Sequence, residues 1–117
     1  MSEKQIIFYD KKTCGTCKKA KIYLDEGQYD YKVIDINKTP PPRDLLEKYV
    51  DVSDIKRFLN SRSKIYREKE FSKQLPKKTE AIDLMLEHPD LIKRPVIIQG
   101  ETVLFGFEAN DVDDLKR

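Results

Sequence analysis

Cys14 and Cys17 are the only cysteines of the chain, and they stand two residues apart in the stretch KTCGTCKKA. Such a pair can form a reversible disulfide, supply half of a zinc site, or pack as two small apolar side chains. A structural zinc site needs four ligands, and the chain has one histidine, His88 in EHPD. Redox chemistry is therefore the leading hypothesis. A zinc half-site completed by a second chain and a pair of inert, packed cysteines are the alternatives, and we expect no metal within one chain.

The pair lies between a predicted strand and a predicted helix. The apolar run QIIFYD, residues 5–10, is typical of a buried strand. Cys17, Ala20 and Leu24 recur at the spacing of one helix face. An alternating strand follows at residues 30–36. Because a strand, a helix and a strand follow one another within one short segment, the sequence predicts a βαβ unit with parallel strands.

This placement would activate a thiol. Unpaired backbone N–H groups and the positive end of the helix dipole stabilise a thiolate at a helix N-terminus. Lys18 and Lys19 add positive charge there. Since the thiolate is the nucleophile, we expect Cys14 to attack and Cys17 to resolve the mixed disulfide as the second half of a redox-active disulfide.

Three residues beside the cysteines have expected supporting roles. Gly15 is expected to relieve the steric cost of a tight turn between the two cysteines. The hydroxyl groups of Thr13 and Thr16 can donate hydrogen bonds to a thiolate or a bound anion. Thr13 is equally well suited to cap the helix.

The rest of the chain is first helical and then returns to strands. A helical block covers about residues 41–75, and a further helix is predicted at 77–88. PVIIQ and TVLFGF, separated by GE, predict an antiparallel hairpin, and a short helix ends the chain. The order βαβ, helices, ββα predicts an α/β thioredoxin-like fold with an all-helical lobe inserted at about 41–75, in one domain over 1–117. In this fold Pro95 is expected to be cis and to pack against the cysteines.

Composition excludes several function classes. The net charge is +2, from 23 basic and 21 acidic residues mixed along the chain, and this balance argues neither for nor against nucleic acid. Because no recognition-helix signature is found, we expect no direct contact with nucleic acid. No segment reaches the roughly 18 apolar residues of a membrane helix, and MSEKQIIFYD lacks the apolar core of a signal peptide. We expect a soluble, monomeric, cytoplasmic protein, in a compartment where thiols are kept reduced.

Four stretches occur in an order that resembles a known family: CGTCKKA, RSKIY at 62–66, LIKRPVII and GFEANDV. Together they resemble the arsenate reductase/Spx (ArsC-like) family, from Ile6 to Leu115. The resemblance implies a thioredoxin-like fold and a reactive cysteine at Cys14.

One branch of that family comprises the glutaredoxin-coupled arsenate reductases, with one catalytic cysteine and three arginines around the oxyanion. Cys14 matches the cysteine, and Arg94 matches the arginine before the proline. The other two arginine positions fall at Asn60 and Gly106. Arg62, whose plain interpretation is a solvated charge, is the candidate substitute. The resemblance implies a small thiol or oxyanion substrate, no bound cofactor, and glutathione, glutaredoxin or thioredoxin as the reductant.

The other branch is the Spx type, in which the Cys-X-X-Cys pair is a redox switch and the protein binds the C-terminal domain of the RNA polymerase α subunit. The chain shares the cysteine pair, SRSK and the GF pair before the last helix. Two functions therefore stay open, a thiol–disulfide oxidoreductase related to arsenate reductase and a redox-switched regulator of transcription. Turnover with glutathione, or polymerase binding that depends on oxidation, would separate them.

Overall fold

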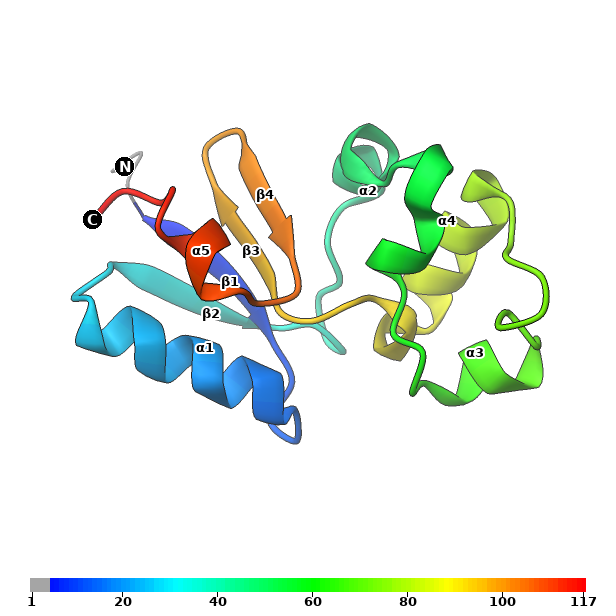
Figure 1. Cartoon of the computed structure of the whole chain (residues 1–117), viewed down its shortest axis with the longest axis horizontal. Coiled ribbons are helices and arrows are strands. Elements are labelled where there is room, and N and C mark those ends of the chain that lie inside the picture. Colours follow the sequence, from blue (N-terminus) through cyan, green and yellow to red (C-terminus); the bar gives the residue numbers. More distant parts are fainter. Residues whose placement is uncertain (1–4) are drawn as a thin grey trace. The chain divides into compact units, whose positions relative to one another are not determined.

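The computed structural model describes residues 5–117. The chain divides into two compact units, each described by itself (Figure 1). The sheet unit comprises the chain up to Ile36 and Arg94–Arg117, and the helical unit comprises Asn37–Lys93. Both cysteines and Arg94 belong to the sheet unit, so the geometry of the cysteine site is built within one unit.

The sheet unit has four strands and two helices. They are β1 (Ile6–Asp10), α1 (Gly15–Glu26), β2 (Tyr31–Asp35), β3 (Val96–Gln99), β4 (Thr102–Phe105) and α5 (Ala109–Val112). The strand order is β2-β1-β3-β4. β1 is parallel to β2 and antiparallel to β3, and β3 is antiparallel to β4. The predicted thioredoxin-like arrangement of βαβ plus ββα is confirmed.

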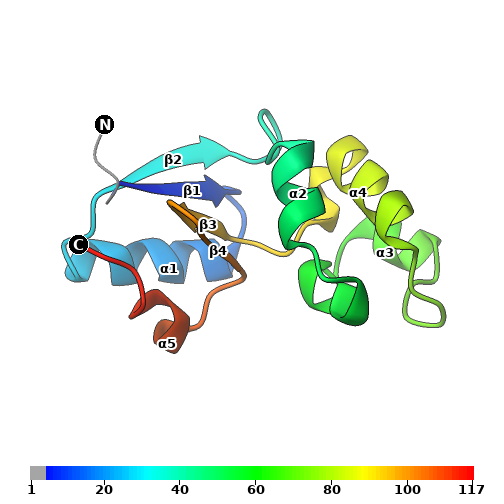
Figure 2. The same cartoon turned by 90° about the horizontal axis from the view of Figure 1, so that it is seen from above.

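The core of the sheet unit lies between the sheet and its two helices. α1 and α5 cover the same face of the sheet (Figure 2). Successive side chains of a strand point to opposite faces of the sheet, and those on the covered face meet the apolar stripe of α1. The buried cluster consists of Ile6, Phe8, Cys17, Ala20, Leu24, Tyr29, Ile97, Val112 and Leu115. Cys17 is therefore both a core residue and a member of the site.

The helical unit contains α2 (Arg43–Tyr49), η1 (Val52–Phe58), α3 (Lys64–Glu68), α4 (Lys78–Glu87) and η2 (Pro89–Leu91), where η marks a 3-10 helix. Its own buried residues include Leu46, Phe58, Tyr66, Ile82 and Met85. This unit is longer than the insertion expected at about 41–75, because it includes α4. Apolar periodicity locates helices but does not tell which neighbour each one packs against.

Within the helical unit, α2 and α4 are linked by a salt bridge between Arg43 and Asp83. The segment 61–75, the last part of the expected helical block, forms only the short α3. Ser63 begins α3, because its side-chain oxygen accepts a hydrogen bond from the Tyr66 backbone N–H. Glu70 then takes a positive φ of 53°, which ends the helical course of the chain.

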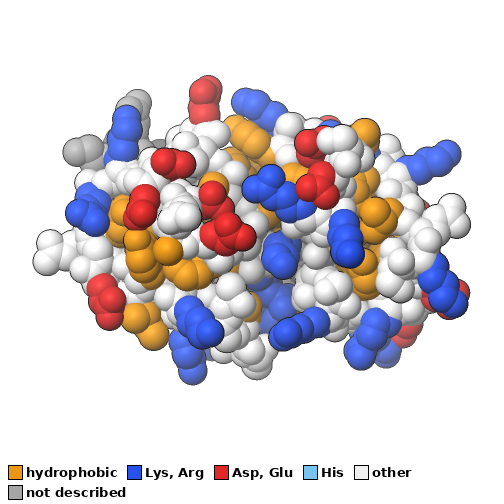
Figure 3. Space-filling view, viewed as in Figure 1, with side chains coloured by type: hydrophobic (Ala, Val, Ile, Leu, Met, Phe, Trp, Pro, Cys, Tyr) orange, Lys and Arg blue, Asp and Glu red, His pale blue; other side chains and the backbone are white. Residues whose placement is uncertain are grey.

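The surface carries charges of both signs, as the composition implies. Both basic and acidic side chains occupy the face drawn in Figure 3, in keeping with the near balance of 23 basic and 21 acidic residues. Among the helices of residues 5–117, none is long and apolar enough to cross a membrane.

Candidate active site

The cysteine pair sits where β1 turns into α1. Cys14 is the N-cap of α1, and its Sγ accepts a hydrogen bond from the Cys17 backbone N–H at 3.2 Å. Both cysteines are free thiols; Cys14 is half-buried, whereas Cys17 is buried with 0% of its side chain exposed. A sulfur in the N-cap position faces the orphan N–H groups of the helix. The expected division into an accessible Cys14 and an inner Cys17 agrees with this geometry.

The surroundings of Cys14 favour its thiolate. Burial, the largest single cause, raises the pKa of Cys14. Hydrogen bonds from the side chain and backbone of Cys17 lower it, as do the hydrogen bond and the charge of Arg94, and together these outweigh burial. The net result is a pKa below the ordinary value for cysteine. Because the thiolate is the attacking form, Cys14 has the properties of a nucleophile.

The surroundings of Cys17 favour its neutral thiol. Burial is the largest cause, followed by the hydrogen bond to Cys14, and they raise the pKa of Cys17 to about 12. The charges of Cys14 and Asp10 act in the same direction, against a backbone hydrogen bond from Lys11. The two sulfurs thus differ: Cys14 ionises more readily than an ordinary cysteine, whereas Cys17 keeps its proton near neutral pH.

Arg94 and Pro95 border the site from the start of β3. The Arg94–Pro95 peptide bond is cis, as expected, and Pro95 is buried. The Pro95 carbonyl accepts a hydrogen bond from the Gly106 backbone N–H at 2.8 Å. The Arg94 side chain forms a hydrogen bond with Cys14, so the residue before Pro95 reaches the Cys14 sulfur.

Two expectations about the turn are wrong. Thr13 does not cap α1, because Cys14 occupies the N-cap position. Gly15 is not needed for steric reasons, since a Cβ there would meet nothing within 4 Å and its φ is not in the left-handed region. Thr13 and Thr16 are both exposed beside Cys14, and their roles toward an anion stay predictions.

The two family arginine positions that fall at Asn60 and Gly106 have structural explanations. The Asn60 side chain accepts a hydrogen bond from the Arg62 backbone N–H at 3.1 Å and donates one to the Asp90 carbonyl at 3.0 Å. Gly106 has a φ of 90°, which a residue with a Cβ adopts only under strain. Arg62 is an exposed residue of the helical unit, and its anion-binding role stays a prediction.

Asp10 and Lys21 are site residues that the sequence analysis did not identify. Asp10 ends β1 with 6% of its surface exposed, and its Oδ2 lies 3.0 Å from Lys21 Nζ. Lys21 is one helical turn after Cys17 on α1. Two features of the sequence could have identified them: Asp10 is an acidic residue at the end of a predicted buried strand, and Lys21 follows Cys17 by four residues on the predicted helix.

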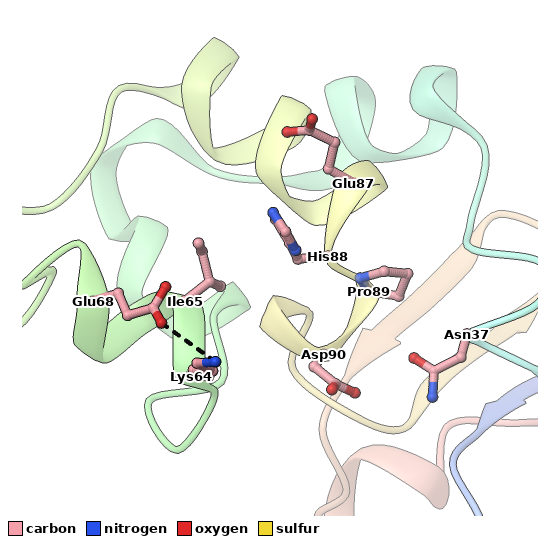
Figure 4. A pocket seen from close by; sticks show the side chains of 8 residues that line it. All are labelled: Asn37, Lys64, Ile65, Glu68, Glu87, His88, Pro89 and Asp90. Atoms are coloured by element: carbon pink, nitrogen blue, oxygen red, sulfur yellow. Dashed lines mark ion pairs between the residues drawn. The ribbon is translucent and has the colours of Figure 1, made fainter.

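A cavity of about 420 Å³ lies in the helical unit. Figure 4 shows side chains of α3 on one side of it and residues 87–90 on the other. His88 and the ion pair of Lys64 with Glu68, 3.7 Å long, contribute to its lining. In the described part of the chain, no group of three or more His, Cys, Asp or Glu residues could hold a metal ion.

The class that fold and site define is a thioredoxin-like sheet with a Cys-X-X-Cys pair at the N-terminus of its first helix. Comparison with known proteins gives the particular family. The sequence model of the ArsC family matches residues 9–115, and the chain belongs to that family.

Among the individual relatives, some are described as arsenate reductases and others as regulators of transcription. The uncharacterized protein YusI of Bacillus subtilis is 33% identical over 113 residues, which cover 93% of this chain and 96% of YusI. The crystal structure described as "a possible arsenate reductase" from Streptococcus mutans has a TM-score of 0.80 and 31% identity, over 92% of this chain and 97% of that one. The global transcriptional regulator Spx 2 of Bacillus anthracis is 24% identical, over 92% of this chain and 83% of its own length.

Proposed function

We propose that this protein is an ArsC-type thiol–disulfide oxidoreductase that works in the cytoplasm as a monomer. The observation that carries the proposal is the contrast between the two sulfurs. Cys14 caps α1 and has a lowered pKa, whereas Cys17 is buried with a pKa raised to about 12. A nucleophilic and a protonated sulfur side by side suit an attacking and a resolving role.

The proposed reaction has two exchanges. The Cys14 thiolate attacks one sulfur of a substrate disulfide, so that a mixed disulfide forms and the other half leaves as a thiolate. Cys17 then loses its proton and attacks the Cys14 sulfur, which forms the Cys14–Cys17 disulfide and releases the second thiolate. Glutathione, a glutaredoxin or a thioredoxin, each oxidised in turn, returns the pair to the dithiol.

The anion-binding side of the site favours a small anionic thiol over arsenate. Arg94 supplies one guanidinium beside Cys14, while Asn60 and Gly106 supply none. Each guanidinium adds charge-assisted and often bidentate hydrogen bonds to an oxyanion. A site with Arg94, and with Arg62 as the candidate second arginine, suits a glutathione carboxylate better than arsenate. We therefore propose glutathione mixed disulfides as substrates and expect weak arsenate reduction.

Turnover is the test of this function. The purified protein would be assayed with glutathione and a small disulfide, and separately with arsenate, with a Cys14→Ser variant as the control. We expect disulfide reduction that Cys14→Ser abolishes, and arsenate reduction slower than disulfide reduction. Absence of glutathione-dependent turnover in the wild type would contradict the proposal, and arsenate as the better substrate would contradict its substrate preference.

A second candidate function is an Spx-like regulator whose disulfide changes its affinity for a protein partner. The similarity to Spx 2 over 92% of the chain favours it. The partner would be the C-terminal domain of the RNA polymerase α subunit, without direct contact to nucleic acid. Calorimetric titration of that domain with the reduced and the oxidised protein tests this. Tight binding in only one state would support the regulator, whereas no binding in either state would exclude it.

A further inference from the structure

The turn before α1 and the first half of α1 carry positive charge without any negative charge. Residues 11–19 contain four lysines and no acidic residue. Three of these lysines, Lys12, Lys18 and Lys19, are exposed. In the described part of the chain, none of the three forms an ion pair or a side-chain hydrogen bond. We call these three residues the lysine rim.

Folding does not explain the lysine rim. Positive charge near the start of a helix opposes the helix dipole, whereas an acidic residue there is favourable, and the first turn of α1 has no acidic residue. Lys21, the next lysine of α1, is paired with Asp10 and so has a structural role. The contacts that lower the pKa of Cys14 come from Cys17 and Arg94. Charges that do not help the fold indicate a function.

The lysine rim lies around the reactive sulfur. The Lys18 backbone N–H donates a hydrogen bond to the Cys14 carbonyl at 3.2 Å, so the two residues are one helical turn apart on the same face of α1. Long side chains of a helix lean toward its N-terminus, which directs the Lys18 ammonium group toward the end that carries Cys14. Lys12 stands two residues before Cys14, and Lys19 follows Lys18. A molecule that reaches Cys14 therefore meets the rim.

We propose that the lysine rim is a docking surface for acidic peptide segments. The preferred substrates are then mixed disulfides of glutathione with protein cysteines that are flanked by Asp or Glu. This inference deepens the proposed oxidoreductase function and rests on it.

The reaction on such a substrate balances as follows. The Cys14 thiolate attacks the glutathione sulfur, which bonds glutathione to Cys14 and releases the peptide as a thiolate. Cys17 then loses its proton and attacks the Cys14 sulfur, which forms the Cys14–Cys17 disulfide and releases glutathione as a thiolate. Two further glutathione molecules, which become oxidised glutathione, restore the dithiol.

The small size of the rim favours a short acidic segment over a nucleic acid. Non-specific binding of nucleic acid depends on the neutralisation of many phosphates, and the rim offers three ammonium groups. α5 covers the same face of the sheet as α1 (Figure 2) and is flanked by the carboxylates of Glu108, Asp113 and Asp114. These would repel a long polyanion that extends over the sheet unit. A peptide with a few carboxylates beside its cysteine matches the rim better.

Matched glutathionylated peptides test the docking surface. Two peptides each carry one glutathionylated cysteine and differ only in its neighbours, which are glutamates in one and glutamines in the other. The reduced protein is mixed with each peptide, the reaction is stopped with acid, and the released peptide thiol is quantified. Each rate constant is divided by that of the same peptide with dithiothreitol, which corrects for intrinsic reactivity. The readout is the ratio of the acidic to the neutral peptide, because a change in Cys14 itself alters both rates alike.

We expect a ratio of about 10 at low ionic strength, the lower end of the effect of a charged surface on local substrate concentration. It should fall toward unity in about 0.5 M salt, because mobile ions screen the lysines. Lys18→Glu combined with Lys19→Glu should lower the ratio below unity. Lys32→Glu combined with Lys116→Glu is the matched control, with the same change of charge at exposed positions of the sheet unit outside the rim. It should keep the wild-type ratio, and an equal response of the two double variants would overturn the proposal.

Stability separates docking from a structural role. Glutamate near the start of a helix is more favourable than lysine, so Lys18→Glu combined with Lys19→Glu should unfold at the same or a higher denaturant concentration than the wild type. If this variant is less stable instead, Lys12→Glu decides, because Lys12 lies in the turn outside α1. It should lower the ratio as well, and an unchanged ratio in Lys12→Glu would then overturn the proposal.

The same assay separates the other outcomes. A DNA duplex that inhibits reduction of the neutral peptide more strongly than polyglutamate of equal charge would assign the rim to nucleic acid and overturn the proposal. A wild type that reduces neither peptide would contradict the proposed oxidoreductase function. Reduction of both peptides at equal corrected rates would leave that function in place and overturn this inference alone.

Discussion

At the scale of single residues, the site separates two chemically identical side chains by their surroundings. Cys14 receives hydrogen bonds at the open end of a helix and lies beside a guanidinium group, and both favour a charged sulfur. Cys17, three residues later, is enclosed by the core, which favours a neutral sulfur. The spacing of the pair therefore sets its chemistry, because one turn of helix carries the chain from the surface into the core.

This contrast predicts how alkylation depends on pH. Because the pKa of Cys14 is lowered and that of Cys17 is raised to about 12, Cys14 should be alkylated fully at a pH where Cys17 is still untouched. The rate for Cys14 should rise with pH through its lowered pKa and then stay constant. Iodoacetamide labelling followed by peptide mass analysis measures both rates. Equal labelling of the two cysteines would contradict the assignment.

Arg94 should account for part of the lowered pKa of Cys14. Arg94→Gln removes both its charge and its hydrogen bond, so the alkylation midpoint of Cys14 should move to higher pH. Arg62→Gln is the matched control, an exposed arginine changed in the same way. It should leave the midpoint in place and, if Arg62 binds an anion, raise only the KM for glutathione. A midpoint that is insensitive to Arg94→Gln would show that Arg94 does not act on the sulfur.

At the scale of the elements, the N-terminus of α1 carries the site. A glycine stands at each end of α1, and the two differ in whether a larger residue would fit. Gly15 is the first residue of α1, with open space where a Cβ would stand. Gly27 follows the last residue of the same helix, and a Cβ there would lie 2.6 Å from Cε2 of the buried Tyr29 ring. The glycine at the end of the helix is thus required, and the one beside the cysteines is not.

The two glycines give a paired prediction. Gly15→Ala should be neutral or stabilise the protein by up to about 1 kcal/mol, because alanine loses less conformational freedom on folding. Gly27→Ala should destabilise it by about 1–3 kcal/mol, since the added methyl group overpacks against Tyr29. Denaturant unfolding of both variants measures the two values. A large loss of stability in Gly15→Ala would show that the turn does need glycine.

The C-terminal segment is held by one side chain of β3. Gln99 Nε2 donates to the Lys116 carbonyl at 2.7 Å, and Gln99 Oε1 accepts from the Lys116 backbone N–H at 2.8 Å. Gln99→Leu removes both bonds and should cost about 1–3 kcal/mol of unfolding free energy, at roughly 0.5–1.5 kcal/mol for each bond. Amide hydrogen exchange at Lys116 should speed up. Unchanged exchange there would contradict the role of Gln99.

At the scale of the whole molecule, the chain combines two units that each have a core of their own. The sheet unit buries the stripe Cys17, Ala20 and Leu24 of α1, and the helical unit buries apolar residues such as Leu46 and Ile82. The chemistry of the cysteine pair belongs to the sheet unit. Departures from the arsenate reductase pattern, at Asn60 and Gly106, occur in both units, and each has a local structural cause.

Stability of the sheet unit should depend on its buried stripe. Leu24→Ala, at a position with 0% exposure, should cost about 2–5 kcal/mol. Ile22→Ala is the matched control on the same helix, because Ile22 is 52% exposed, and it should change unfolding by at most about 0.5 kcal/mol. Thermal or denaturant unfolding measures both. Similar losses in the two variants would contradict the assigned orientation of α1.

Periodicity and turn residues sufficed to predict the fold, because the strands of 5–10 and 30–36 and the hairpin after Pro95 carry strong local signals. The cysteine pair and Arg94 were identified from their types and from the family resemblance. Three-dimensional packing was needed for the rest. Only the structure shows that Cys14 itself caps α1, and that Lys21 meets Asp10 across the turn, since contacts between side chains of different elements leave no periodic trace.

The central claim is that Cys14 and Cys17 form a reversible disulfide in which Cys14 is the attacking sulfur. The most direct measurement is equilibration of the purified protein in glutathione redox buffers, followed by alkylation and mass analysis of the wild type and of Cys17→Ser. We predict one Cys14–Cys17 disulfide in the wild type and a stable glutathione adduct on Cys14 in Cys17→Ser. A wild type that stays a dithiol in every buffer, or an adduct on Cys17 in a Cys14→Ser variant at the same rate, would contradict the account.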